Sequence, residues 1–136
     1  SYYPPLLRER RLVPGQLCTV KGAGGTIEAM PCRLEHGEIP SLGFRFGNIA
    51  YTPDLSAIPP DSRSYLEELD VWIVDALRYR PHPSHFSLPE TLDWIDRLKP
   101  KRAILTNLHT DLDFARLQGE LPANVEPAFD GMCVLA

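Results

Sequence analysis

Five side chains that could bind a metal ion or transfer a proton follow segments that the sequence predicts to be strands. They are the four histidines of the chain and one aspartate: His36, Asp54, His82, His85 and His109. In open α/β sheets ligands bind beyond the carboxyl ends of the strands, so residues distant in sequence can surround one site. Imidazole nitrogen and carboxylate oxygen suit Zn or Mn. Because an aspartate can bridge two cations, and a water between them becomes a nucleophile near neutral pH, the pattern favours metal-assisted hydrolysis.

Each of these residues also has an ordinary structural interpretation. A loop histidine is often solvated or caps a helix, and Asp54 follows a proline, as turn aspartates do. Asp111 and Asp113 precede a predicted helix, and we expect at least one of them to be its N-cap or a first-turn residue. On spacing alone the metal site and the structural interpretation therefore both stay open.

The segment Asp70–Leu88 organises the predicted site. Val71–Val74 is an apolar run rich in β-branched residues, which is typical of a strand buried on both faces. The polar loop after it contains His82 and His85. Ser87–Glu90 has the S-x-x-E pattern of a capping box with an early proline, so we expect a helix from Leu88 to Leu98.

Glycines, prolines and hydrophobic periodicity place the other elements. Lys21–Gly25 resembles a phosphate-binding loop, but the alternating residues after it predict a strand, so we interpret the glycines as a hairpin turn. Further strands are expected at 26–34, 42–46, 49–52 and 102–106, with an edge strand at 131–135. Helices are expected from residue 59 to Leu69, and around Phe114 and Leu117.

The composition limits the class of protein. Of its 136 residues, 43% are apolar and 24% are charged, as in a globular domain, and no apolar run approaches the roughly 20 residues needed to cross a bilayer. The net charge of −4 argues against broad binding to a nucleic-acid backbone. Three widely spaced cysteines without a C-x-x-C pair indicate buried, reduced thiols, and we expect a cytoplasmic protein without a membrane anchor.

Five short motifs in order then indicate a family. They are E-H-G-x-x-x-S-L-G-F-R-F-G at 35–47, Y-T-P-D at 51–54, H-P-S-H-F-S at 82–87, I-L-T-N-L-H at 104–109 and F-D-G-M at 129–132. Over roughly residues 26–136 the chain resembles the metallo-β-lactamase superfamily, and within it the phosphoribosyl cyclic phosphate phosphodiesterases.

The resemblance implies an α/β fold, an αββα sandwich with a mixed sheet and helices on its outer face, and two divalent ions, Zn or Mn. By position, His36 would be a metal ligand, Asp54 would bridge the two ions, and His85 would face the phosphate as the catalytic acid. The last ligand aligns without a gap on Asn107. We favour His109, two residues later, because imidazole is the better ligand for a transition metal; a site with one weakened ligand is the alternative.

The superfamily's H-x-H-x-D-H motif is absent from this sequence. We therefore expect residues 1–136 to be the C-terminal portion of one domain whose N-terminal half lies in a preceding segment. We also expect the isolated portion to be inactive.

The leading hypothesis is a metal-dependent phosphodiesterase that hydrolyses a small cyclic phosphate with a metal-bridged hydroxide. The predicted partners are this substrate and the N-terminal half, with a homodimer left open. One alternative is a nuclease that processes RNA 3′ ends, which the acidic chain disfavours; another is a non-catalytic interaction domain that has lost a ligand. Arg45, Arg78 and Arg80 could hold a phosphate, although solvated or paired arginines are the simpler interpretation.

Overall fold

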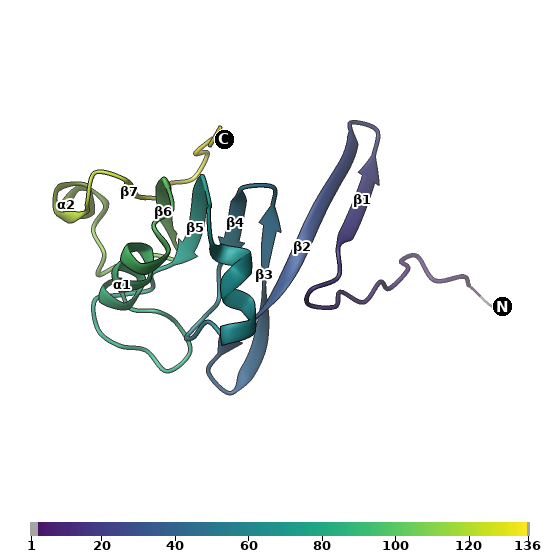
Figure 1. Ribbon diagram of the computed structural model, residues 1–136, viewed down its shortest axis with the longest axis horizontal. Helices are drawn as coiled ribbons and strands as arrows, with labels where there is room; N and C mark the ends of the chain where they lie inside the picture. Colours follow the sequence, from purple (N-terminus) through teal and green to yellow (C-terminus); the bar gives the residue numbers. More distant parts are fainter. Residues whose placement is uncertain (1–2, 136) are drawn as a thin grey trace.

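The computed structural model describes residues 3–135, which form one mixed sheet with helices on one face (Figure 1). The seven strands lie side by side in sequence order. They are β1 (Cys18–Gly22), β2 (Gly25–His36), β3 (Ile39–Phe46), β4 (Ile49–Thr52), β5 (Val71–Asp75), β6 (Arg102–Thr106) and β7 (Val125–Pro127). The helices are the 3-10 helix η1 (Pro60–Leu66) and the α-helices α1 (Leu88–Leu98) and α2 (Phe114–Glu120). The predicted α/β class with a mixed sheet is confirmed.

Tight turns build the antiparallel part of the sheet. The glycines after Lys21 form the β1–β2 hairpin, in which Gly22 pairs with Gly25, so the hairpin prediction is confirmed. β3 and β4 also form a hairpin, whose turn contains Gly47 at φ 56°, a left-handed conformation that favours glycine. β2 is the longest strand and runs from the first hairpin to the turn before β3 (Figure 1).

Strands β4 to β7 are parallel to one another. Because β2 and β4 are both antiparallel to β3, β2 has the same direction as this parallel group. The carboxyl ends of β2, β4, β5 and β6 therefore share one edge of the sheet, as the sequence analysis required.

The core lies between the sheet and the helices. Alternate residues of β5, Trp72 and Val74, are fully buried in one cluster with Leu66 of η1 and Ile95 of α1. The indole N–H of Trp72 donates to the Thr52 hydroxyl at 3.0 Å, which satisfies its buried polar atom.

The helix α1 begins and ends where the sequence predicts. The backbone N–H of Ser87 donates to Oε2 of Glu90 at 2.8 Å, so the capping box is formed. At the other end Lys99 takes a left-handed conformation with φ 50° before Pro100. Asp113 caps α2 by accepting from the N–H of Arg116 at 2.9 Å, which confirms the helix-capping interpretation for this residue.

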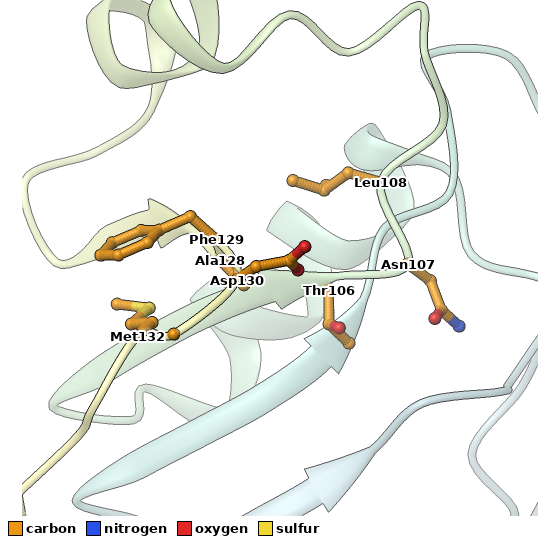
Figure 2. A pocket seen from close by; sticks show the side chains of 8 residues that line it. Thr106, Asn107, Leu108, Ala128, Phe129, Asp130 and Met132 are labelled. Atoms are coloured by element: carbon orange, nitrogen blue, oxygen red, sulfur yellow. The ribbon is translucent and has the colours of Figure 1, made fainter.

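One predicted helix is shorter than expected, and one predicted strand is wrong. The helix expected to reach Leu69 is the 3-10 helix η1, which ends at Leu66. It ends there because Glu68 is left-handed with φ 53°, and because the N–H of Asp70, just before β5, already donates to the carbonyl of Asn48. Residues 131–135 form no strand; the last strand is β7, which pairs with β6 through Val125. After β7 the chain turns between Phe129 and Met132 (Figure 2), and the N–H of Met132 donates to the carbonyl of Phe129. Residues 131–135 therefore have strand propensity but pair with no strand within residues 3–135.

The cysteine prediction holds only in part. Cys32 is buried, and desolvation raises the pKa of its thiol, whereas Cys18 is half-buried and Cys133 is exposed. All three are free thiols. Within residues 3–135 the helices are too short or too polar to cross a membrane.

Candidate functional site

Three of the predicted site residues lie together at the common edge of the sheet. His36 is the last residue of β2, Asp54 follows β4 by two positions, and His85 belongs to the loop between β5 and α1. Each offers one ligand atom, and these atoms all lie within 4.8 Å of one another. The ring centroids of His36 and His85 are 4.6 Å apart. Side chains from three separate segments therefore converge on one point, at a spacing that fits a single divalent cation.

A backbone carbonyl sets the orientation of His36. Its Nδ1 lies 2.7 Å from the carbonyl oxygen of Ser84, so Nδ1 carries the hydrogen and donates it. The neutral ring then has its lone pair on Nε2, which is the arrangement that metal-binding histidines use. The donor set therefore fits a transition-metal ion.

The next residue, Gly37, brings the β2–β3 turn against the histidine loop. Its φ is +64°, and a Cβ there would lie 3.1 Å from the Cβ of Ser84. Its N–H donates to the hydroxyl of Ser56 at 2.9 Å, which also ties the turn to the segment after Asp54. Close backbone contact between three loops thus positions His36.

His85 is oriented by a buried carboxylate, Asp75. The His85 Nδ1 and the Asp75 Oδ2 are 2.6 Å apart, and Oδ2 also accepts from the N–H of Leu55 at 3.5 Å. Asp75 is fully buried and, within residues 3–135, its Oδ1 has no hydrogen-bond partner. Desolvation raises the pKa of Asp75 to about 6, although its contact with His85 opposes the rise. This pair leaves Nε2 of His85 available to a ligand.

Asn107 lies beside Asp54 at the end of β6. Its Nδ2 donates to the Pro53 carbonyl at 2.5 Å and to Oδ1 of Asp54 at 3.2 Å. Since a carbonyl can only accept, the Pro53 contact directs the amide N–H groups, and not the amide oxygen, toward Asp54. Asn107 thus donates a hydrogen bond that holds the Asp54 carboxylate. The Asp54 side chain is 49% exposed.

His109 is held apart from this cluster. Its Nδ1 lies 3.1 Å from Oδ1 of Asp111, and its side chain is 58% exposed. It is not among the three residues whose ligand atoms converge. The role of His109 as a metal ligand stays a prediction.

His82 lies next to the cluster. Its ring centroid is 5.3 Å from that of His85, and desolvation, followed by the charge of Arg78, lowers the pKa of its imidazole. The sequence singled out His82 as a strand-exit histidine without giving it a role.

Two of the three arginines that could have held a phosphate bind backbone carbonyls. Arg45 donates to the carbonyls of Tyr65 and Glu67, and Arg78 donates to those of Arg80 and Pro81. These contacts agree with the simpler interpretation of paired surface arginines.

The sequence predicts no role for Asp75 or Ser84. An acidic residue that ends an apolar strand ten positions before a histidine is a readable signal for Asp75. Ser84 acts through its backbone carbonyl and N–H, which no residue type reveals.

These observations define an α/β protein with a candidate metal site at the carboxyl edge of its sheet. The sequence model of the beta-lactamase superfamily domain matches residues 3–107. The chain therefore belongs to the beta-lactamase superfamily, as its motifs indicated.

Solved structures agree with this assignment. A diphosphatase of the PhnP family is 34% identical with a TM-score of 0.81, and the match covers 88% of this chain and 46% of that one. The short form of human tRNase Z (23% identity, TM-score 0.56) is matched over 79% of this chain and 41% of its own. The metallo-beta-lactamase fold protein YhfI of Bacillus subtilis (16%, 0.68) is matched over 86% and 51%. The last two show the fold alone.

A curated relative adds a longer context. An octanoyltransferase of Porphyromonas gingivalis is 30% identical over an alignment of 126 positions, and the match covers 86% of this chain and 25% of that protein. The chain thus spans a quarter of this relative and less than half of the PhnP-family structure.

Proposed function

We propose that the chain is part of a metal-dependent phosphodiesterase that acts on a small phosphodiester. The observation that carries the proposal is the convergence of His36, Asp54 and His85, with His85 oriented by buried Asp75. Likeness to a PhnP-family diphosphatase, at 34% identity, supports chemistry at phosphorus.

Each residue has a separate role in this proposal. His36, through Nε2, and Asp54 would hold a divalent ion, Zn or Mn, with a second ion held jointly with ligands from the rest of the protein. The bound metal would activate water and neutralise charge on the phosphate oxygens. His85 donates a proton from Nε2 to the leaving oxygen, while Asp75 keeps Nδ1 engaged and the ring in position.

The test uses the full-length polypeptide loaded with Mn or Zn. We expect metal-dependent hydrolysis of bis-p-nitrophenyl phosphate and of a nucleoside 2′,3′-cyclic phosphate. Asp54→Asn should lose both metal and activity, whereas Asp96→Asn, the same change on the exposed surface of α1, should lose neither. Absence of turnover in a preparation of confirmed metal content would contradict the proposal.

A variant of His85 separates its two conceivable roles. If His85 is the proton donor, His85→Ala retains the metal and loses activity toward substrates with poor leaving groups more than toward p-nitrophenyl esters. Loss of metal from this variant would instead make His85 the third ligand, because its ligand atom lies within 4.8 Å of the other two.

A second candidate is a diphosphatase, because the similar PhnP-family protein of known structure is a diphosphatase. A nucleoside diphosphate ester in the same assay distinguishes a phosphoanhydride substrate from a phosphodiester. A tRNA precursor added as competitor tests the RNA-processing alternative, which the net charge of −4 disfavours.

A further inference from the structure

His82 is held in one tautomer by the residue that also orients His36. The backbone N–H of Ser84 donates to Nδ1 of His82 at 3.3 Å, and the Ser84 hydroxyl lies 3.2 Å from the same nitrogen. A backbone N–H can only donate, so Nδ1 is the acceptor and Nε2 of the neutral ring carries the hydrogen. His82 therefore presents an N–H donor on the side away from Ser84.

The loop around His82 is fixed by its own hydrogen bonds. The Arg78 guanidinium donates to the carbonyl of Pro81 at 2.7 Å, and the N–H of Leu77 donates to the carbonyl of Phe86 at 2.9 Å across the loop. Prolines on both sides of His82 restrict the backbone further. The imidazole is thus held in place before any ligand arrives, which limits the entropy lost on binding.

Ser84 gives its two histidine neighbours opposite hydrogen-bonding characters. Its carbonyl takes the Nδ1 hydrogen of His36 and leaves a lone pair on Nε2, whereas its N–H occupies Nδ1 of His82 and leaves an N–H on Nε2. A lone pair binds a cation, and an N–H binds an anion. The His85 ring is a neighbour of both histidines, with its centroid 4.6 Å from that of His36 and 5.3 Å from that of His82.

We propose that His82 is a substrate-binding residue, whose Nε2–H donates to a non-bridging oxygen of a phosphate group placed at the His36–Asp54–His85 cluster. The inference rests on the proposed function for the identity of the substrate. It adds an oxyanion contact supplied by a neutral side chain, so that the phosphate meets a metal on one side and a fixed N–H donor on the other.

The experiment compares two variants of the full-length, metal-loaded polypeptide. His82→Phe removes the donor and keeps a ring, whereas His82→Gln can place an amide N–H near the position of Nε2. The probe is inorganic phosphate, measured by calorimetric titration and as a competitive inhibitor. We expect His82→Phe to weaken phosphate binding about tenfold and to raise the KM for bis-p-nitrophenyl phosphate by a similar factor. This is the loss typical of one hydrogen bond to a charged group. Metal content should not change, and His82→Gln should recover most of the loss.

Tyr79→Phe is the matched control, because it removes from the same loop a hydroxyl that binds Glu120 instead of the site. The inference is overturned if phosphate affinity is the same in His82→Phe and the parent, if His82→Gln is as weak as His82→Phe, or if His82→Phe loses metal. Should the parent bind phosphate through His82 but hydrolyse no phosphate ester, the proposed function fails and the oxyanion contact stands.

Discussion

The loops that follow β5 and β6 begin side by side at one edge of the sheet, yet they hold their histidines differently. The loop after β5 is joined to its surroundings through Ser84 and Asp75, so His85 has a buried partner and faces His36. In the loop after β6, His109 contacts Asp111 of the same loop, and its imidazole is mostly exposed. Both sequences offer a histidine after a strand, so residue type does not separate them.

The difference is one of anchoring. The N–H of Phe86 donates to the carbonyl of Leu55 at 2.7 Å, which ties the first loop to the segment after β4. The second loop contributes to the site through Asn107, whose left-handed backbone (φ 57°) turns its amide onto Pro53 and Asp54. A histidine becomes a site residue here only where neighbouring loops fix its ring.

The largest effect should follow from Asp75→Asn, which removes the buried acid of the first loop. Because the folded-state pKa is raised from 3.8 to about 6, the folded protein binds this proton more tightly than the unfolded chain. Below pH 4 this tighter proton binding raises the free energy of unfolding by up to about 3 kcal/mol, and this contribution is lost as the pH rises through 6. In urea unfolding with EDTA, Asp75→Asn should therefore gain stability relative to the parent between pH 4 and pH 7.

The control for this experiment is Asp96→Asn, on the exposed surface of α1, which should follow the parent at every pH. Parallel curves for Asp75→Asn and the parent would show that burial does not govern the titration of Asp75.

A smaller effect is expected from Gly37→Ala, which disturbs the contact between the first loop and the β2–β3 turn. The new Cβ meets Ser84 at 3.1 Å, and a left-handed backbone costs an L-residue about 1–2 kcal/mol. We expect a matching loss of stability and a roughly tenfold weaker affinity for Zn or Mn, since the carbonyl that orients His36 moves.

Gly24→Ala is the matched control for the glycine substitution. It lies in the β1–β2 turn, has open space around it and lacks a positive φ, so metal affinity should be unchanged. Equal metal affinity in Gly37→Ala and Gly24→Ala would mean that the turn does not position His36.

The smallest effect should come from His109→Ala in the second loop. The exposed ring contacts only a surface acid here, so we expect a change in stability within about 0.5 kcal/mol and no change in metal content by elemental analysis. A loss of metal would instead confirm the sequence prediction of His109 as a ligand.

Local chemistry was sufficient for many of the elements. The capping box at Ser87 marks the start of α1 and the proline at position 100 marks its end, while glycines mark the hairpin turns. These elements were predictable because such signals act within a few residues. The same reasoning failed at two places. Residues 67–69 leave the helix because Glu68 is left-handed and the chain turns toward β5. Residues 131–135 have strand propensity but pair with no strand among the residues that the structure describes.

The sequence alone determined which residue types follow the strands, and hence that His36, Asp54 and His85 could meet at one edge. Only the tertiary structure decided which nitrogen of each ring is free and which side chain stands beside Asp54. Ser84 lies 48 positions from His36, and Asn107 lies 53 positions from Asp54. The physical reason is that hydrogen bonds to backbone groups orient these side chains, and a backbone group has the same chemistry in almost every residue, so only its position in space distinguishes it.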